Sequence, residues 1–554
     1  MARGRLALLP MLALALARPS IAQGRDATAS PGPPTVRTEA GRVRGLAGEG
    51  VRRFLGIRYA RPPAGPWRWW PPRPAAPWPG VRDATRAGAA CAQADELGAF
   101  AGTVRQGEDC LFLNVTEPPA QAVRPRRGWP VLVWLHGGGL VAGEGASYDG
   151  GAFARGTVPG PVVVVTVNYR LGLFGFLAHP ALDGEGHAFA NYGLMDQALA
   201  LRWVRRNIAA FGGDPGRVTI AGQSSGGSSV AALMIARGTK GLFHRAIFQS
   251  GLFLPIASVR DAEAGGGAFA VSAGCPAVAV PAAGDCLRKL TTAQVVALQV
   301  GEGGRGGVPI GFVADGAILP SPVADPWSAG AFRRVPVLSG TTADEGRFDA
   351  SIDEMRSGRL SAAGYERLVG AMFPRNGRGF ADDAAAAILA RYPAARFDSP
   401  ALALSAVVTD FHVCPIPAIH RAMARFVPVF AYEFADRDAP WYFPPQSFAA
   451  GAAHSADLQY LFPLWHGGRR GTTHALAAPQ RELSRRLVAA WATFAYAGDP
   501  NGRGVPRWPR FAPGAETLLV QSPSGFRVEG QAGFNDRHQC AFWAWIRRAP
   551  PQPR

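Results

Sequence analysis

Short, almost continuously apolar runs recur through this 554-residue chain, the clearest at residues 130–135, 162–167 and 218–222. Residues 191–207 lie between two such runs and have helical periodicity, with Leu194, Ala198, Leu201 and Val204 on one face. Strands that are apolar on both faces are typical of parallel sheets covered by helices on each side. The alternation therefore predicts an α/β fold with a large, mostly parallel sheet flanked by helices.

Other segments extend this pattern without a linker-like break. The expected strands are residues 43–45, 54–57 and 111–115, a turn is expected at 211–215, and a helix at 226–235. We therefore expect one domain, residues 23–554, with long insertions.

The N-terminus has the pattern of an export signal. Arg3 and Arg5 precede an apolar stretch, residues 6–17, and Ser20-Ile21-Ala22 offers a cleavage site of small residues. The apolar stretch is too short to span a membrane. Residues 1–22 are predicted to be a signal peptide, and the mature protein to be secreted or periplasmic, without an integral membrane segment.

The formal charge of +18 raises the question of nucleic-acid binding. The basic residues are almost all arginine and are scattered; the densest groups lie at residues 124–127 and 202–206. A nucleic-acid surface requires a concentrated basic stripe. The pattern favours a general preference for arginine over a nucleic-acid partner.

Six cysteines in an exported chain suit disulfide formation, and 15 pairings are possible. Pairing of neighbours among the first four is the simplest, because each bridge would close a short loop. The sequence has no C-x-x-C pattern and its ten histidines are dispersed, so no metal site is expected.

Residues 222–226, Gly-Gln-Ser-Ser-Gly, fit the pattern G-x-S-x-G between a predicted strand and a predicted helix. In this setting a sharp turn lifts the serine oxygen clear of the backbone, and the helix N-terminus faces developing negative charge. The pattern alone is compatible with an ordinary glycine turn. The flanking strand and helix favour Ser224 as a nucleophile.

A second glycine motif, residues 136–139, His-Gly-Gly-Gly, follows directly after the strand at 130–135. Glycines let main-chain N–H groups approach a substrate oxygen closely. Two such motifs in this order, each at a strand end, together indicate acyl-transfer chemistry.

Collinear segments along nearly the whole mature chain resemble the type-B carboxylesterases, a family of α/β-hydrolases that includes the cholinesterases. The segments that carry this resemblance are residues 54–60 (FLGIRYA), 108–115 (EDCLFLNV), 168–172 (NYRLG), 211–215 (FGGDP), 241–247 (GLFHRAI) and 540–543 (CAFW).

The resemblance implies the partners of Ser224. The family's acidic residue lies in a D-E-G segment, matched by residues 344–346, which implies Glu345, with Asp344 as its nearest alternative. The family's base lies in a G-x-x-H segment, matched at 451–454, which implies His454. The order Ser, acid, His is that of an α/β-hydrolase.

The resemblance also implies the rest of the site. The family's oxyanion hole maps onto the N–H groups of Gly138, Gly139 and Ser225, and no metal or cofactor is needed. The implied substrate is a small carboxylic ester. The implied disulfides join Cys91 to Cys110, Cys275 to Cys286 and Cys414 to Cys540.

The chain departs from the family at three positions that we expect to line the site: Gln223 replaces a glutamate, Ser225 an alanine, and Leu140 an aromatic residue. No tryptophan lies between Cys91 and Cys110, where cholinesterases carry one. We therefore expect neutral esters rather than choline esters as substrates. A formal glycosylation sequon at Asn114 lies in an expected strand and is interpreted as incidental.

Two alternatives remain open. An amide or carbamate hydrolase would use the same residues, since ester and amide cleavage share this machinery. A non-catalytic, esterase-like adhesion protein would typically have lost the serine or the histidine, and this chain retains both.

Overall fold

The computed structural model describes most of the chain. Described are residue 1 and residues 32–547 except for 95–101, 157, 253–255, 301–309, 321–324, 375–379, 382, 464 and 466–470. Apart from Met1, the predicted signal peptide lies outside the described residues.

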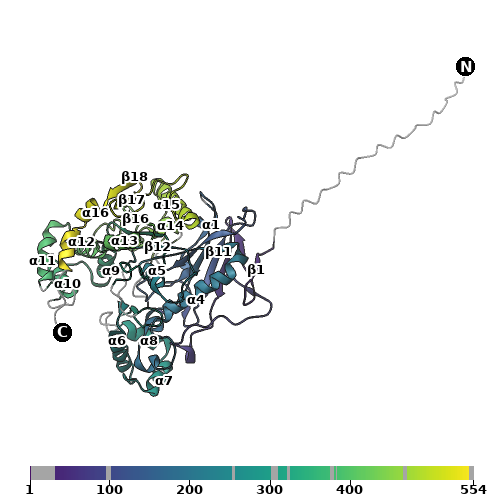
Figure 1. Ribbon diagram of the computed structural model, residues 1–554, viewed down its shortest axis with the longest axis horizontal. Coiled ribbons are helices and arrows are strands. Elements are labelled where there is room, and N and C mark those ends of the chain that lie inside the picture. Colours follow the sequence, from purple (N-terminus) through teal and green to yellow (C-terminus); the bar gives the residue numbers. More distant parts are fainter. Residues whose placement is uncertain are drawn as a thin grey trace.

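A twisted sheet of eleven strands runs through the molecule (Figure 1). Neighbouring strands from β10 through β9, β11, β12, β15 and β16 to β17 pair in parallel, and the strands at both edges pair antiparallel. In sheet order the strands are β18 (Gly525–Gly530), β17 (Thr517–Ser522), β16 (Val429–Phe434), β15 (Val337–Thr342), β12 (Arg245–Gln249), β11 (Gly213–Gln223), β9 (Trp129–Leu135), β10 (Val163–Val167), β8 (Phe112–Glu117), β4 (Val51–Arg58) and β3 (Leu46–Gly48). The predicted α/β class, with a mostly parallel sheet, is confirmed.

Short strands form three smaller sheets. These strands are β1 (Thr35–Arg37), β2 (Arg42–Arg44), β5 (Val81–Asp83), β6 (Ala90–Cys91), β7 (Gln106–Gly107), β13 (Ile256–Ala257) and β14 (Phe312–Val313). The strand expected at 43–45 thus corresponds to β2 and is separate from the main sheet, which β4 joins.

The helices are numbered along the chain. They are α1 (Gly151–Ala154), α2 (Gly172–Phe176), α3 (Pro180–Asp183), α4 (Tyr192–Asn207), α5 (Ser225–Ile235), α6 (Val259–Ser272), α7 (Pro281–Lys289), α8 (Thr292–Val300), α9 (Arg347–Ser357), α10 (Ala362–Met372), α11 (Ala384–Arg391), α12 (Pro400–Val413), α13 (Ile416–Ala424), α14 (Leu458–Leu461), α15 (Ala478–Ala497), α16 (Gln531–Arg537) and α17 (Cys540–Ile546).

Both faces of the central strands are buried. Along β9, Val131 and Val133 enter one core cluster with apolar residues of α4 and α5, whereas Leu132 and Trp134 enter another with apolar residues of α15. The four apolar residues predicted on one face of α4 all belong to the first cluster. Burial on both faces explains why these strands are apolar throughout rather than alternating.

The turn expected at 211–215 is partly wrong. Strand β11 already begins at Gly213, and its pairing with β9 shifts register between Gly213 and Val218. The residues within this irregularity include the glycine and the proline that suggested a turn in the sequence.

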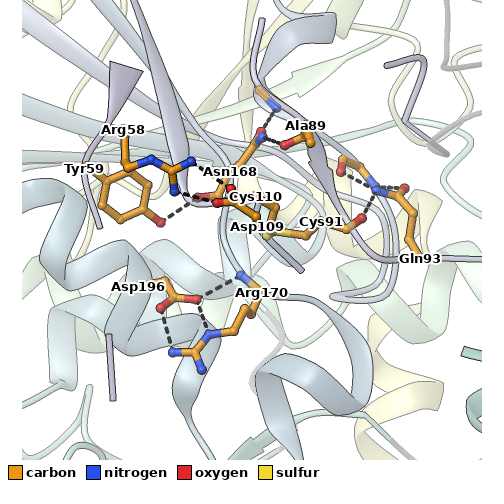
Figure 2. Close-up of a disulfide and its surroundings, with 12 residues drawn as sticks. Arg58, Tyr59, Ala89, Cys91, Gln93, Asp109, Cys110, Asn168, Arg170 and Asp196 are labelled. Atoms are coloured by element: carbon orange, nitrogen blue, oxygen red, sulfur yellow. Dashed lines mark hydrogen bonds and ion pairs between the residues drawn. A yellow bond between two sulfur atoms is a disulfide. The ribbon is translucent and has the colours of Figure 1, made fainter. Parts of the chain in front are cut away.

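The three disulfides join the predicted pairs: Cys91–Cys110, Cys275–Cys286 and Cys414–Cys540. Figure 2 shows the first bridge, beside the ion pair of Arg58 with Asp109 and the hydrogen bond that the Tyr59 hydroxyl donates to the carbonyl oxygen of Asn168. The third bridge connects the end of α12 to the start of α17.

Asn114 of the sequon is buried in β8. Its amide donates to Thr166 Oγ1 (3.0 Å) and its carbonyl oxygen accepts from the Gly56 N–H (2.9 Å). The side chain is thus engaged inside the sheet, in agreement with the interpretation that the sequon is incidental.

Among the described residues, one apolar helical stretch, Pro400–Ala424, is long enough to cross a membrane, and more than half of its most apolar window is buried within the protein. It comprises α12 and α13, and α12 packs against α9.

Candidate active site

Ser224 lies at the turn between β11 and α5, in a strained conformation with φ 56° and ψ −129°. The flanking glycines are required by space: a Cβ on Gly222 would lie 2.4 Å from Gly226 backbone atoms, and one on Gly226 would lie 2.1 Å from the Leu135 carbonyl oxygen. The Ser224 N–H donates to the carbonyl oxygen of Gln249 on β12 (2.8 Å). The packing of the turn against β9 and β12 therefore holds the strained serine in place.

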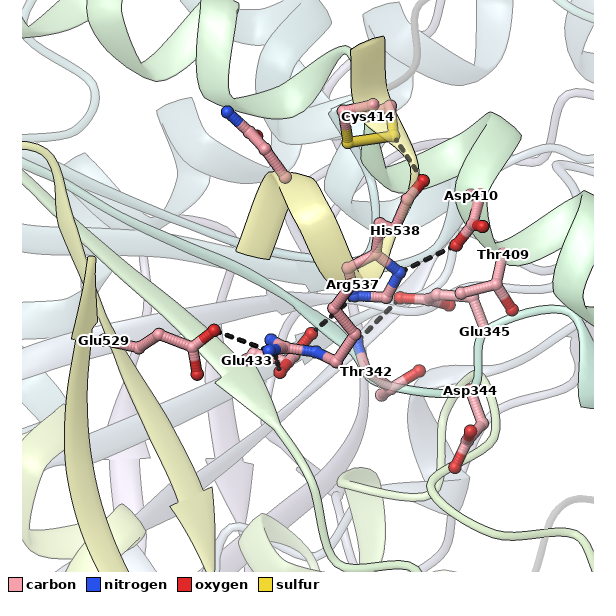
Figure 3. Close-up of polar contacts among 12 residues, drawn as sticks. Thr342, Asp344, Glu345, Thr409, Asp410, Cys414, Glu433, Glu529, Arg537 and His538 are labelled. Carbon is pink, nitrogen blue, oxygen red and sulfur yellow. Dashed lines mark hydrogen bonds and ion pairs between the residues drawn. A yellow bond between two sulfur atoms is a disulfide. The ribbon is translucent and has the colours of Figure 1, made fainter. Parts of the chain in front are cut away.

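Glu345 and His454 meet beside this turn. His454 Nδ1 lies 2.5 Å from Glu345 Oε2. The other carboxylate oxygen, Glu345 Oε1, accepts a hydrogen bond from the Thr342 N–H (2.8 Å; Figure 3). Burial alone would raise the pKa of Glu345, but the charge and hydrogen bond of His454 hold it below its ordinary value. Burial would likewise lower the pKa of His454, but Glu345 raises it above its ordinary value.

Asp344, the alternative acid, is directed elsewhere. Its carboxylate pairs with Arg437 (3.2 Å) and Arg347 (3.5 Å) and accepts from the Ala452 N–H (3.0 Å). The structure therefore favours Glu345 as the partner of His454.

Gln223 contacts the imidazole rather than the substrate space. Its Nε2 lies 3.0 Å from His454 Nε2. An imidazole that carries its proton on Nδ1, toward Glu345, has a lone pair on Nε2 that can accept this amide N–H. The expectation that Gln223 lines the site is wrong: its side chain is fully buried and lies outside the cavity wall, whereas Leu140 and Ser225 line it as expected.

The glycine loop after β9 adopts left-handed backbone angles at Gly138 (φ 110°), Gly139 (φ 64°) and Leu140 (φ 62°). The Leu140 N–H donates to Ser225 Oγ (3.0 Å). The Ser225 hydroxyl, which the family's alanine would lack, thus ties this loop to the first residue of α5. Gly138, Gly139 and Ser225, the residues expected to form an oxyanion hole, line one cavity.

His136, the first residue of the same motif, has a structural role. Its ring stacks on Tyr169 with centroids 4.4 Å apart, and the Tyr169 hydroxyl donates to the His136 carbonyl oxygen (2.7 Å). Burial lowers the pKa of His136 to about 4. The side chain is therefore neutral at physiological pH and supports the loop.

The cavity has a volume of about 360 Å³, within the range of small-molecule sites. Ser224, Glu345 and His454 all line it. Its wall also includes side chains from distant segments that no sequence motif indicated: Ile310, Phe312, Phe348, Asp349, His412 and Val413. Among the residues that the structure describes, no cluster of three or more His, Cys, Asp or Glu is arranged to hold a metal ion.

Comparisons with known proteins agree on one family. The chain matches the sequence profile described as "Carboxylesterase family" over residues 32–543. It is 34% identical to para-nitrobenzyl esterase of Bacillus subtilis over 505 residues, which cover 88% of this chain and 94% of that protein. It is 31% identical to liver carboxylesterase of Sus scrofa, over 97% of this chain and 96% of that one.

A relative from Sphingopyxis macrogoltabida, fumonisin B1 esterase, is 33% identical over 513 residues, 88% of this chain and 86% of that protein. The structure of a PNB esterase superposes with a TM-score of 0.73 at 30% identity, covering 91% of this chain and 99% of that one.

Proposed function

The chain belongs to the carboxylesterase family and is an ester hydrolase, and from this premise we propose that it works through Ser224, His454 and Glu345 by way of an acyl-enzyme. The observation that carries the proposal is the meeting of these three side chains at one cavity, with His454 Nδ1 2.5 Å from Glu345 Oε2. Nucleophile, base and orienting acid in this arrangement are the requirements of serine-dependent acyl transfer.

In the first half of the reaction, Ser224 Oγ attacks the ester carbonyl carbon and His454 Nε2 takes its proton. Glu345 accepts the Nδ1 proton as a hydrogen bond and stabilises the imidazolium. The carbonyl oxygen becomes an oxyanion, and the N–H groups of Gly138, Gly139 and Ser225 are the proposed donors to it. The carbon–oxygen bond to the alcohol then breaks, and His454 protonates the departing alkoxide.

In the second half, water attacks the acyl group on Ser224 and gives its proton to His454. The bond to Ser224 breaks, His454 returns the proton to Oγ, and the carboxylic acid departs. Every proton moves between this chain's own residues, the substrate and water.

The same proposal includes export of a single hydrolase domain, residues 23–554, after removal of residues 1–22. The three disulfides support it, because such bridges persist in oxidising compartments. Mass determination of the mature N-terminus of the protein recovered outside the cytoplasm tests it; an intact N-terminus on cytoplasmic protein with free thiols would contradict it.

A panel of nitrophenyl esters from acetate to long-chain acyl, run beside a matched nitroanilide and a carbamate, tests the reaction class. We expect turnover of the esters and much slower turnover of the anilide and the carbamate. Faster anilide or carbamate cleavage would point to an amide or carbamate hydrolase. Absence of turnover of every substrate would point to a non-catalytic adhesion protein.

The proposed substrates are uncharged around the scissile carbonyl, because residue 223 beside the nucleophile is a neutral glutamine. Replacing it with glutamate should place a negative charge near His454 Nε2, which Gln223 contacts at 3.0 Å. A carboxylate there stabilises the imidazolium and raises the pKa of His454. We expect Gln223→Glu to move the acid limb of the kcat/KM profile upward by about 1 pH unit, since the base stays protonated to higher pH.

The second readout of the same variant is charge selectivity. The native enzyme should show no preference for a choline ester over its uncharged dimethylbutyl counterpart. Gln223→Glu should raise the ratio of kcat/KM for the choline ester to kcat/KM for the uncharged ester. Gln223→Met, of similar size and uncharged, should leave the acid limb in place. An unchanged limb and ratio in the glutamate variant would show that residue 223 has neither effect.

A further inference from the structure

The cavity contains a carboxylate that the proposed reaction does not use. Asp349 lies in the first turn of α9, one helical turn beyond Glu345, and its side chain is exposed while the flanking residues Phe348 and Ala350 are buried. It lines the same cavity as Ser224 and His454. Its exposed surface therefore faces the space that a substrate occupies.

Asp349 differs from the other carboxylate of the wall. Glu345 is engaged by His454 and by the Thr342 N–H. Among the described residues, no side chain donates a hydrogen bond to Asp349 or forms an ion pair with it; it interacts through space with His454, Glu345 and Asp353. Its carboxylate is thus available to a ligand.

Among the described residues of the wall, only the two histidines can carry a positive charge, and His454 is already paired with Glu345. Leu140, Phe312, Phe348 and Val413 are apolar. His412, which faces the cavity from α12, has its pKa lowered to about 4 by burial and is neutral at physiological pH. A carboxylate in such surroundings is poorly solvated, and a cation placed against it recovers part of the lost solvation.

We propose that Asp349 is a specificity-determining residue that recognises a cationic group, an ammonium or guanidinium, carried by the ester away from its scissile carbonyl. The inference rests on the proposed function and narrows its substrate class. Because residue 223 is a neutral glutamine, it places no charge near the scissile carbonyl. Asp349, in contrast, places one negative charge on another part of the cavity wall. The fitting substrate is uncharged at the ester group and positively charged at the end that reaches α9.

This recognition depends on pH in a defined direction. Although the Asp349 side chain is open to the cavity, the surrounding protein atoms desolvate it and raise its pKa to about 6; the charge of His454 opposes this rise, and those of Asp353 and Glu345 add to it. Cation preference should therefore appear as pH rises through about 6, when the carboxyl loses its proton. A substrate with a quaternary ammonium keeps its charge at every pH, so the change reports the protein alone.

The test uses matched pairs of esters that differ only in a terminal trimethylammonium or tert-butyl group, with a series of chain lengths. One series places the group on the acyl side of nitrophenyl esters, and the other places it on the alcohol side of butyrate esters, with spacers longer than that of the choline ester, for which no preference is expected. At pH 8 we expect the native enzyme to favour the cation at least about 10-fold in kcat/KM at its best chain length, as one partly desolvated ion pair would give. The preference should decline below pH 6.

Asp349→Asn should bring the ratio to about one, and Asp349→Glu, which keeps the charge, should retain a preference. Because each ratio is measured within one variant, a change in overall rate cancels. Asp353→Asn is the matched control: Asp353 lies one helical turn further along α9 and lines a different surface cavity. At pH 8, where Asp349 has already lost its proton, this control should keep both the native rate and the native ratio.

The outcomes separate this inference from the proposed function. If the native enzyme hydrolyses the neutral esters but shows no cation preference at any chain length in either series, the role of Asp349 is overturned and the esterase proposal stands. A preference that survives in Asp349→Asn overturns it equally. If neither member of any pair is hydrolysed, the proposed function itself fails.

Discussion

Ser224→Ala is expected to lower kcat for nitrophenyl butyrate by about 10⁴–10⁶-fold, because alanine lacks the oxygen on which the proposed acyl-enzyme forms. The variant should also lose covalent labelling by a fluorophosphonate, which reacts with an activated serine. The protein should remain folded, since alanine at this position removes one oxygen that lines the cavity. The measurements are steady-state turnover, mass spectrometry of the labelled peptide and circular dichroism.

The matched control is Ser524→Ala, at an exposed position beside the β17–β18 turn. It should keep native turnover and native labelling. Labelling at a serine other than Ser224, or native turnover in Ser224→Ala, would contradict the assignment of the nucleophile.

His538→Gln is expected to destabilise the protein by about 3–5 kcal/mol, the cost of removing one partner from a buried ion pair. His538 is almost fully buried and lies between two carboxylates, with Nδ1 2.8 Å from Asp410 Oδ1 and Nε2 2.9 Å from Glu433 Oε1 (Figure 3). Glutamine cannot carry the positive charge that both carboxylates face. The measurement is urea unfolding with the disulfides intact.

The same site predicts how stability depends on pH. Burial would lower the pKa of His538, but the hydrogen bonds and charges of Asp410 and Glu433 raise it to about 9, against about 6.5 in the unfolded chain. The contribution, about 3 kcal/mol, is fully present below pH 6.5 and is lost as pH rises through 9. Native protein should therefore lose stability between pH 6.5 and 9.5, and His538→Gln should lack this part of the decline.

Arg421→Ala serves as the control for ion pairing in general. Its guanidinium contacts Glu516 at 2.5 Å but is half exposed, so its loss should cost less than about 1 kcal/mol. Equal losses in the two variants, or a pH dependence that His538→Gln leaves unchanged, would show that the buried cluster does not act as described.

The His538 cluster also adjoins the acid loop of the site. Asp410 on α12 follows Thr409, whose hydroxyl accepts from the Gly346 N–H (2.9 Å), next to Glu345. The disulfide at Cys414 ties the end of the same helix to α17. Helix α12 thus links the buried charges, the bridge and Glu345, the proposed catalytic acid.

The features of this molecule that could be predicted follow from patterns within short segments of the sequence. The elbow at Ser224 could be predicted because Gly222 and Gly226 have no room for a Cβ, a constraint visible in a five-residue pattern. The helix at α4 could be predicted because its apolar residues recur at helical spacing and fill one core cluster. Pairing of neighbours was already the simplest expectation for the two short-range disulfides. The assignments of Glu345, His454 and the Cys414–Cys540 bridge required the resemblance to the family, because these residues lie far from their partners in the sequence.

Sequence by itself determined the α/β class and the elbow around Ser224, because both follow from periodicity and from backbone space within short segments. Only the tertiary structure decided between Asp344 and Glu345, placed Gln223 against His454 instead of in the cavity, and brought Asp349 and His412 into its wall. These outcomes depend on how α9, α12 and the loop before α14 pack together. Burial and charge at each such position are set by neighbours from remote segments, which no local pattern records.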